Sequence, residues 1–342
     1  MAVLRAQRAT DPAAGLVRLQ AAWSGLPARD RLALIDALLV GLGPDDEAFL
    51  NHQLLKDRSQ DLRRRAADLL AALPGSAFGQ RMAQRLAPRV RARPGERVAL
   101  EVEAPPAPPA KAVLADDPHP GDFPDAERSV HERLGERAWC LHQLVRRSPL
   151  GWWTAHTGFT PEALLAAAER TDWTEALVRG WAHAALTQPD PDWSLALLDH
   201  PRIGRWGDPA ALLAQLPAAT REAHLNRRWR AWAAAPGKTS LISMLDGCLR
   251  GLPADAIWGP TLSAAVAQSL RTALADGSLW QTLLTEHAAR HTLLETACAL
   301  HPESLEALAA LPTEDPQGGA LGARLQTLHQ VRALRQSLSA LF

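Results

Sequence analysis

Two histidines one helical turn apart form the pattern in this sequence that most directly suggests metal chemistry. His287 and His291 would share one face of a helix, and that spacing can hold a zinc ion. The glutamate, Glu286, precedes the first histidine, whereas the zinc-protease motif places it directly after, and Cys298 is the one further ligand nearby. The pattern favours histidines that lie on the surface or are half-buried. The alternative is a metal-dependent enzyme in which His287 and His291 bind the metal.

Two other short patterns suggest catalysis at first sight. The run Pro236-Gly237-Lys238-Thr239 is similar to the end of a phosphate-binding loop, but the position where that loop needs its first glycine holds Trp232. We predict a turn between helices there. Cys140 and His142 would lie on diverging faces of a helix, which disfavours a thiolate-imidazole pair. We therefore predict no catalytic residues, no metal ligands and no cofactor, and expect the protein not to be an enzyme.

A run of arginines is the strongest electrostatic feature, although the whole chain balances 37 Lys+Arg against 37 Asp+Glu. Its members are Arg81, Arg85, Arg89, Arg91 and Arg93. At helical spacing the first three would form a stripe that could neutralise phosphates, so nucleic-acid binding through residues 81–97 is an alternative. Because no aromatic residues are interleaved for base stacking, a solvated helix face or a surface that meets the acidic C-terminal part of the chain is favoured. The same basic face is also the candidate surface for a protein partner.

Tryptophan is unusually frequent, with 12 residues, and several fall at helical spacing. Trp173 and Trp181 would share one helix face, as would Trp229 and Trp232. Large aromatic residues at such spacing usually fill the space between helices. A groove lined by these four tryptophans, which would bind a peptide or a ligand, is the alternative.

The composition predicts an all-α protein. Leu and Ala dominate, Tyr is absent, and Val and Ile are scarce, so strong helix formers outnumber the residues that favour strands. We find no apolar run long enough for a signal peptide or a membrane span, so we expect a cytoplasmic protein without membrane association. The three cysteines, Cys140, Cys248 and Cys298, fall on apolar helical patterns and are predicted to be buried, reduced thiols.

Capping residues mark where the predicted helices begin and end. Asp11-Pro12 is predicted to open one helix, and a second is predicted over Arg29–Leu42, with an apolar side made of Leu32, Ile35, Leu38 and Leu39. Pro44 would begin a third helix, and Ser59 would cap a fourth that ends before Pro74-Gly75. Later helices are predicted to begin at Thr160-Pro161 and at Asp172, which has Glu175 three residues on.

These elements predict helix pairs separated by tight turns. Such pairs bury their faces only by stacking on neighbours, which indicates a helical-repeat architecture. We divide the chain into N-terminal repeats (1–97), a proline-rich connector (98–128) and a tryptophan-rich helical region (129–342). Within the connector, Val98–Val102 alternates and could form one short strand.

The segment Asp57–Leu73 resembles the second half of a HEAT repeat, with an Asp in the turn and small residues along the helix. Three stretches, 45–82, 134–153 and the tryptophan- and leucine-rich tail through 197–201 and 216–222, resemble a bacterial HEAT-like family of unknown function. The most specific block is Gly-Glu-Arg-Ala-Trp at 135–139, where Cys140 replaces a usual second tryptophan. The resemblance implies an all-α, HEAT-like α-solenoid.

That family looks like one whose genes neighbour those for MoxR-type AAA+ ATPases, von Willebrand factor A proteins and SWIM zinc-finger proteins. The resemblance therefore implies an adaptor or scaffold in an ATPase-dependent assembly and assigns no catalytic residues. We expect a non-enzymatic scaffold whose partner is a protein, and the resemblance implies a MoxR-type ATPase or a von Willebrand factor A protein as the candidate. Nucleic acid is the less favoured partner.

Overall fold

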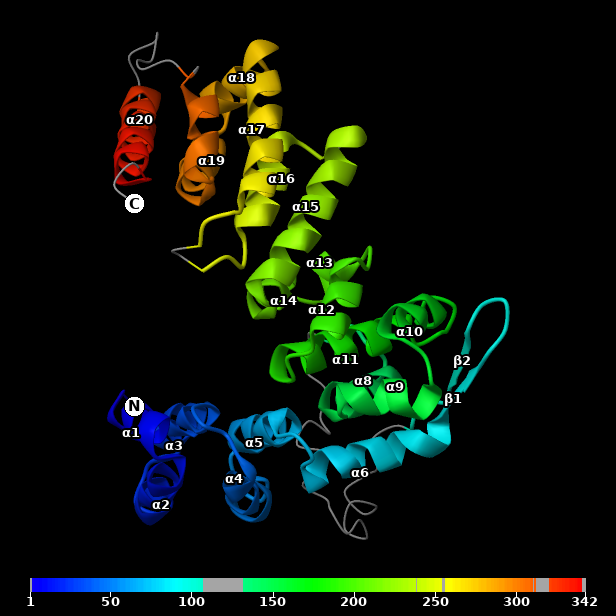
Figure 1. Ribbon diagram of the computed structural model, residues 1–342. Helices are drawn as coiled ribbons and strands as arrows, with labels where there is room; N and C mark the ends of the chain where they lie inside the picture. The colour runs from blue at the N-terminus through cyan, green and yellow to red at the C-terminus, as the bar shows by residue number, and fades with distance from the viewer. Residues whose placement is uncertain are drawn as a thin grey trace. The chain divides into compact units, whose positions relative to one another are not determined.

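The computed structural model describes residues 2–106, 132–237, 239–253, 256–309, 311 and 320–339. As predicted, the described chain is all-α, with one two-stranded antiparallel sheet (Figure 1). It divides into two compact units, Met1–Asp208 (unit 1) and Pro209–Phe342 (unit 2). Of the predicted connector at 98–128, residues 107–128 lie outside the described residues. Within the described residues, no helix has the length and apolarity needed to cross a membrane.

Short helices make up the N-terminal part of unit 1. In chain order they are α1 (Ala2–Thr10), α2 (Pro12–Trp23), α3 (Ala28–Ile35), the 3-10 turn η1 (Asp36–Leu39), α4 (Pro44–Phe49), the π-helical turn η2 (Leu50–Leu54), α5 (Gln60–Ala72), α6 (Ala77–Leu86) and the 3-10 turn η3 (Ala87–Arg89). Asp11 and Ser59 cap α2 and α5 through their side chains, as predicted. The sequence patterns did not predict α1.

The predicted helix over Arg29–Leu42 is wrong in its second half. α3 ends at Ile35 and continues as the tighter turn η1, which rotates the following side chains away from the α-helical stripe. Ile35 and Leu38 are buried, but Leu32 is 37% exposed and Leu39 is 50% exposed. The apolar residues of this segment therefore do not share one buried face.

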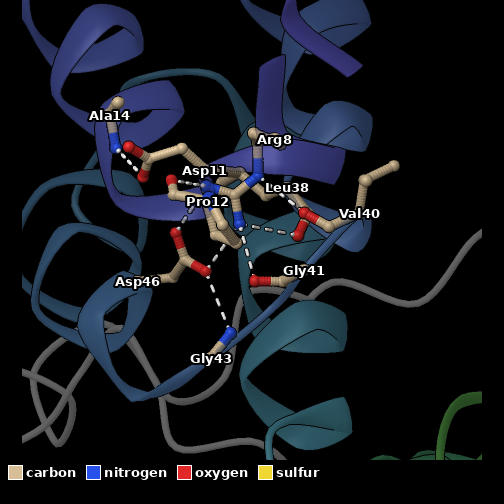
Figure 2. Close-up of polar contacts among 9 residues, drawn as sticks. All are labelled: Arg8, Asp11, Pro12, Ala14, Leu38, Val40, Gly41, Gly43 and Asp46. Atoms are coloured by element: carbon tan, nitrogen blue, oxygen red, sulfur yellow. Dashed lines mark hydrogen bonds and ion pairs between the residues drawn. The ribbon is translucent and has the colours of Figure 1, made fainter. Parts of the chain in front are cut away.

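A fully buried arginine joins α1 to the segment between η1 and α4 (Figure 2). The Arg8 guanidinium forms a fork with the Asp46 carboxylate, at 2.8 Å and 3.1 Å. It also donates to four backbone carbonyls, those of Pro12, Leu38, Val40 and Gly41. Asp46 accepts a further bond from the Gly43 N–H. The buried charges are therefore paired and their hydrogen bonds satisfied, which makes this contact a structural clasp.

A β-hairpin follows the N-terminal helices. Strands β1 (Val90–Arg93) and β2 (Ala99–Val102) pair antiparallel, with Val90 opposite Val102. The predicted strand at Val98–Val102 is thus confirmed as β2, and its partner is the end of the arginine run. In Figure 1 the hairpin lies beside α9 (Leu150–Thr157) and α10 (Pro161–Ala168), which contact β1 and β2.

The rest of unit 1 consists of helices packed around buried tryptophans. Besides α9 and α10 it contains α8 (Glu136–Arg147), α11 (Thr174–Thr187), α12 (Pro191–Leu198) and α13 (Ile203–Trp206). Trp153, Trp181 and Trp193 are buried and contact one another in series, the first pair edge-on and the second tilted, with ring centroids 5.1 Å and 5.2 Å apart. Thr160 caps α10 as predicted, whereas α11 begins at Thr174, so the predicted cap at Asp172 is wrong.

Unit 2 consists of helices alone in its described part. They are α14 (Pro209–Gln215), α15 (Ala218–Ala234), α16 (Leu241–Leu249), α17 (Pro260–Ala275), α18 (Ser278–Thr285), α19 (His287–Ala299), the 3-10 helix η5 (Pro302–Leu308) and α20 (Ala320–Ser339). Pro236 and Gly237 separate α15 from α16, and Gly237 has a left-handed φ of 54°. The predicted turn is therefore present, while Lys238 lies outside the described residues.

Candidate functional site

Two histidines meet where α8 and α11 pack together in unit 1. His142 Nε2 lies 3.0 Å from His183 Nδ1. The helices approach closely because α11 has a glycine at the contact: a Cβ on Gly180 would lie 2.5 Å from Cγ1 of Val145 on α8. Gly180 and Val145 are each three residues from one of the histidines, so the glycine contact sets the distance between the two rings.

Behind His142 a chain of hydrogen bonds leads to α5. Gln143 Nε2 lies 3.3 Å from His142 Nδ1, and Gln143 Oε1 accepts a 2.8 Å bond from Arg147. Arg147 and Arg146 both donate to Asp68 on α5. His142, Gln143 and Arg147 are buried, so three helices hold this network rigidly in a low-dielectric interior.

Burial keeps both imidazoles neutral. Desolvation, together with the positive charges of Arg146 and Arg179, lowers the pKa of His183 to about 4. Desolvation also lowers the pKa of His142 well below its usual value, with a contribution from His183. At neutral pH the pair therefore carries no charge.

His183 lines a pocket of about 530 Å³ on unit 1. The pocket is lined by Glu132, Arg133, Glu175, Arg179, His183, Leu186, Arg205, Trp206, Gly207 and Asp208. These residues come from α11, from α13 with the two residues after it, and from the segment before α8. Three arginines and three carboxylates thus surround one neutral imidazole.

The pocket carboxylates are already engaged. Arg179 forms a fork with Glu132 at 2.9 Å and 3.0 Å, and also contacts Glu175 at 3.4 Å. Burial alone would raise the pKa of Glu132, but the bonds from Arg179 and from the Leu134 N–H outweigh it and lower that pKa. Glu132 therefore stays ionised and paired.

The arginine run does not form the predicted helical stripe. Arg81 and Arg85 lie on α6, whereas Arg89 ends η3 and Arg91 and Arg93 lie on β1. Arg81 donates to Asn51 and lies over the Phe78 ring. Strand pairing places Glu101 opposite Arg91 and within 3.0 Å of Arg93, so β2 supplies the negative charge that the run itself lacks.

The four tryptophans proposed as a groove do not line one. Trp181 and Trp229 are fully buried, so they fill the core of unit 1 and unit 2 respectively. Trp173 is half-buried beneath the Arg137 guanidinium. Trp232 is also half-buried, and its indole N–H donates to the Thr239 carbonyl. The core-packing interpretation of these residues therefore holds for the buried pair.

The histidines proposed as metal ligands do not converge. His287 and His291 are exposed on α19, and His291 pairs with Glu295 at 3.3 Å. Cys298 is exposed, which corrects the prediction that it is buried, and lines a second pocket together with His291. Among the described residues no three His, Cys, Asp or Glu side chains are grouped to hold a metal ion.

The other two cysteines behave as predicted. Cys140 and Cys248 are buried, and desolvation raises the pKa of each thiol, to about 11 and about 12. His142 pairs with His183 rather than with the neighbouring thiol. Cys140 therefore stays protonated and packs as a small apolar residue.

The sequence patterns missed His183, Arg179 and Arg205. One signal was present: Glu175, Arg179 and His183 fall at i, i+4 and i+8, which places all three on one face of α11. The residues that bond this face, Glu132 and His142, lie in other segments of the chain. Helical spacing alone therefore could not predict the pocket.

Comparison with known proteins places the whole chain in one family. No curated protein and no solved structure matches it. A family of unknown function, DUF5691, matches residues 1–342. Because the match spans every helix and the pocket, the chain belongs to the DUF5691 family.

Proposed function

We propose that this chain is a non-enzymatic helical scaffold that binds a protein partner, and that the His183 pocket is part of the docking surface. The supporting observation is the pocket itself, in which rigidly held polar groups surround an uncharged imidazole. Polar groups that are positioned before binding lose little entropy when a partner arrives, which suits recognition.

The HEAT-like resemblance of Asp57–Leu73 supports an adaptor role, because stacked helix pairs offer extended protein-binding surfaces. The gene neighbourhood of the resembling family makes a MoxR-type AAA+ ATPase or a von Willebrand factor A protein the partner to look for. Both the HEAT-like repeat and membership of an ATPase-dependent assembly are part of this proposal.

The test is co-purification of the tagged, full-length chain from native lysate at physiological salt, with and without nuclease. We expect a protein retained in fixed stoichiometry after nuclease and lost with Arg205→Glu, which reverses a charge in the pocket. The control is Arg5→Glu, which reverses an exposed charge on α1 and should retain the partner. No retained protein, or equal loss with both variants, would contradict the proposal.

The nuclease arm addresses the nucleic-acid alternative. If the chain binds nucleic acid through residues 81–97, digestion releases the co-purified material, and binding weakens as salt rises. Charge reversal of the exposed Arg91 and Arg93 on β1 would then reduce binding, whereas Arg205→Glu would not.

A further inference from the structure

The hydrogen-bond network behind the pocket determines which nitrogen of His183 carries its proton. Arginine can only donate, so the oxygen of the Gln143 amide must face Arg147, at 2.8 Å, and its NH₂ group must face His142 Nδ1. His142 Nδ1 therefore accepts, and the proton of this neutral ring is on Nε2. His142 Nε2 then donates to His183 Nδ1 at 3.0 Å. The proton of neutral His183 is consequently on Nε2.

That Nε2–H is a hydrogen-bond donor without an acceptor in the described part of the chain. A neutral imidazole with its exposed nitrogen protonated cannot accept a proton there, so it serves recognition rather than general base catalysis. Arg147, Gln143 and His142 hold this donor in place through three successive bonds.

Other donors of the pocket also lack acceptors among the described residues. Arg133 and Arg205 are exposed and have no such partner, and the indole N–H of the buried Trp206 has none either. Arg179 bonds both oxygens of Glu132 and, at 3.4 Å, one oxygen of Glu175, and Asp208 is engaged as well. The accessible donors of the pocket are thus the side chains of His183, Arg133 and Arg205, while each of its three carboxylates has an interaction.

We propose that the His183 pocket binds a carboxylate of the partner, with His183 Nε2–H and Arg205 as its donors. This rests on the proposed scaffold function and names the group that the partner presents: an aspartate or glutamate side chain. A carboxylate offers acceptors alone and matches both an imidazole N–H and a guanidinium, whereas a cation would face unpaired N–H groups. A free small carboxylic acid has the same chemistry, and the experiment separates the two sources.

The test is NMR on the full-length chain with ¹⁵N-labelled histidine. The ring nitrogen shifts report the tautomers, and we expect His142 and His183 both protonated at Nε2. Three probes are then titrated: an end-blocked peptide with two glutamates flanked by glycines, free glutarate, and inorganic phosphate. We expect the peptide to shift the His183 Nε2 resonance at lower concentration than glutarate. Equal responses would assign the site to a small acid, and tighter binding of phosphate would overturn the carboxylate assignment.

The decisive variant is Gln143→Glu, which does not touch the pocket. A glutamate accepts from both Arg147 and His142, so it moves the His142 proton to Nδ1 and turns His142 Nε2 into an acceptor. His183 must then donate through Nδ1, and its Nε2 presents a lone pair to the pocket. We expect both tautomers to switch and peptide binding to weaken roughly 10- to 100-fold, the effect of losing a hydrogen bond to a charged group.

His183→Asn removes the ring but retains an N–H donor, so it serves as the control. We expect it to weaken peptide binding less than Gln143→Glu does. Unswitched tautomers in the wild-type chain, or a tautomer switch without weaker binding, would overturn the carboxylate proposal. If co-purification with the partner survives Gln143→Glu while Arg205→Glu still abolishes it, this inference fails and the scaffold proposal stands. If neither variant affects the partner, the pocket is not the docking surface at all.

Discussion

At the scale of single residues, the buried charges of this protein are explained by their partners. The side chains of Arg8 and Asp46 are 0% and 3% exposed, a location that is costly for any charge without compensation. Every donor direction of Arg8 is used, by Asp46 or by backbone carbonyls. In Figure 2 the guanidinium lies at the centre of these contacts, between α2 and the segment that leads to α4.

We predict that Asp46→Asn destabilises the chain by about 3–5 kcal/mol, because it leaves the Arg8 charge buried without a counter-charge. Urea denaturation followed by circular dichroism measures the change. Asp45→Asn is the matched control: Asp45 is the exposed neighbour in the same first turn of α4, and its loss should change stability by less than about 0.5 kcal/mol. Equal changes in unfolding free energy for the two variants would show that the ion pair between Arg8 and Asp46 does not stabilise the fold.

The histidine pair predicts a dependence of stability on pH. The folded-state pKa of His183, about 4, is below the value of about 6.5 for an unfolded chain, so the unfolded state binds more protons between these values. Stability should therefore fall as the pH is lowered from about 6.5 to about 4. Urea midpoints at several pH values, compared between wild type and His183→Gln, measure this contribution, and identical pH profiles would contradict it.

At the scale of elements, the contact between α8 and α11 decides the geometry of the pocket. Gly180 allows the approach, and the same contact carries His142 and His183 on facing sides of the two helices. Arg179 and His183, one turn apart on α11, then reach Glu132 and His142 respectively.

We predict that Gly180→Ala destabilises the chain even though alanine is the better helix former. The added methyl group would overlap Val145, and such overpacking costs about 1–3 kcal/mol against a propensity gain of up to about 1 kcal/mol. It should also lengthen the bond between His142 and His183, which the ring ¹⁵N shifts detect.

Gly151→Ala on α9 is the control for this substitution, because a Cβ there meets no atom within 4 Å and the change should be neutral or stabilising. Val145→Gly in the Gly180→Ala background removes both Val145 atoms that the methyl group would overlap, Cγ1 at 2.5 Å and Cβ at 2.6 Å, and should restore the histidine shifts. Unchanged shifts in Gly180→Ala alone would show that the glycine does not set the histidine distance.

At the scale of the whole molecule, each of the two units has its own core. Trp153, Trp181 and Trp193 fill that of unit 1, while Trp229 is buried in unit 2. The polar network and the pocket belong entirely to unit 1. A unit with its own core is expected to fold independently.

We predict that the fragment 1–208 folds alone and unfolds cooperatively, with the helical circular dichroism of unit 1. Its His142 and His183 tautomers should match those of the full-length chain, because every residue of their network is retained. Fragment 1–128, which follows the predicted connector instead, lacks α8 and α11 and should lose cooperativity. Cooperative melting of 1–128 but not of 1–208 would contradict the division at Asp208.

Local patterns in the sequence determined the helical class and many helix starts. Asp11, Ser59 and Thr160 cap helices as predicted because a cap depends on the side chain and the next few backbone N–H groups. Helical spacing likewise predicted that Trp181 and Trp229 pack inside, since large apolar surfaces lose free energy when removed from water. These features need no knowledge of distant residues.

Only the tertiary structure decided which polar groups meet. His142 and His183 are 41 positions apart, and Arg8 and Asp46 are 38 apart, so neither pair leaves a trace in helical periodicity. The arginine run illustrates the same limit: Arg81, Arg85 and Arg89 have helical spacing, but α6 ends at Leu86 and the chain continues through η3 into β1, which pairs with β2. Long-range pairing overrides local preference because packing and burial contribute more free energy than propensity does.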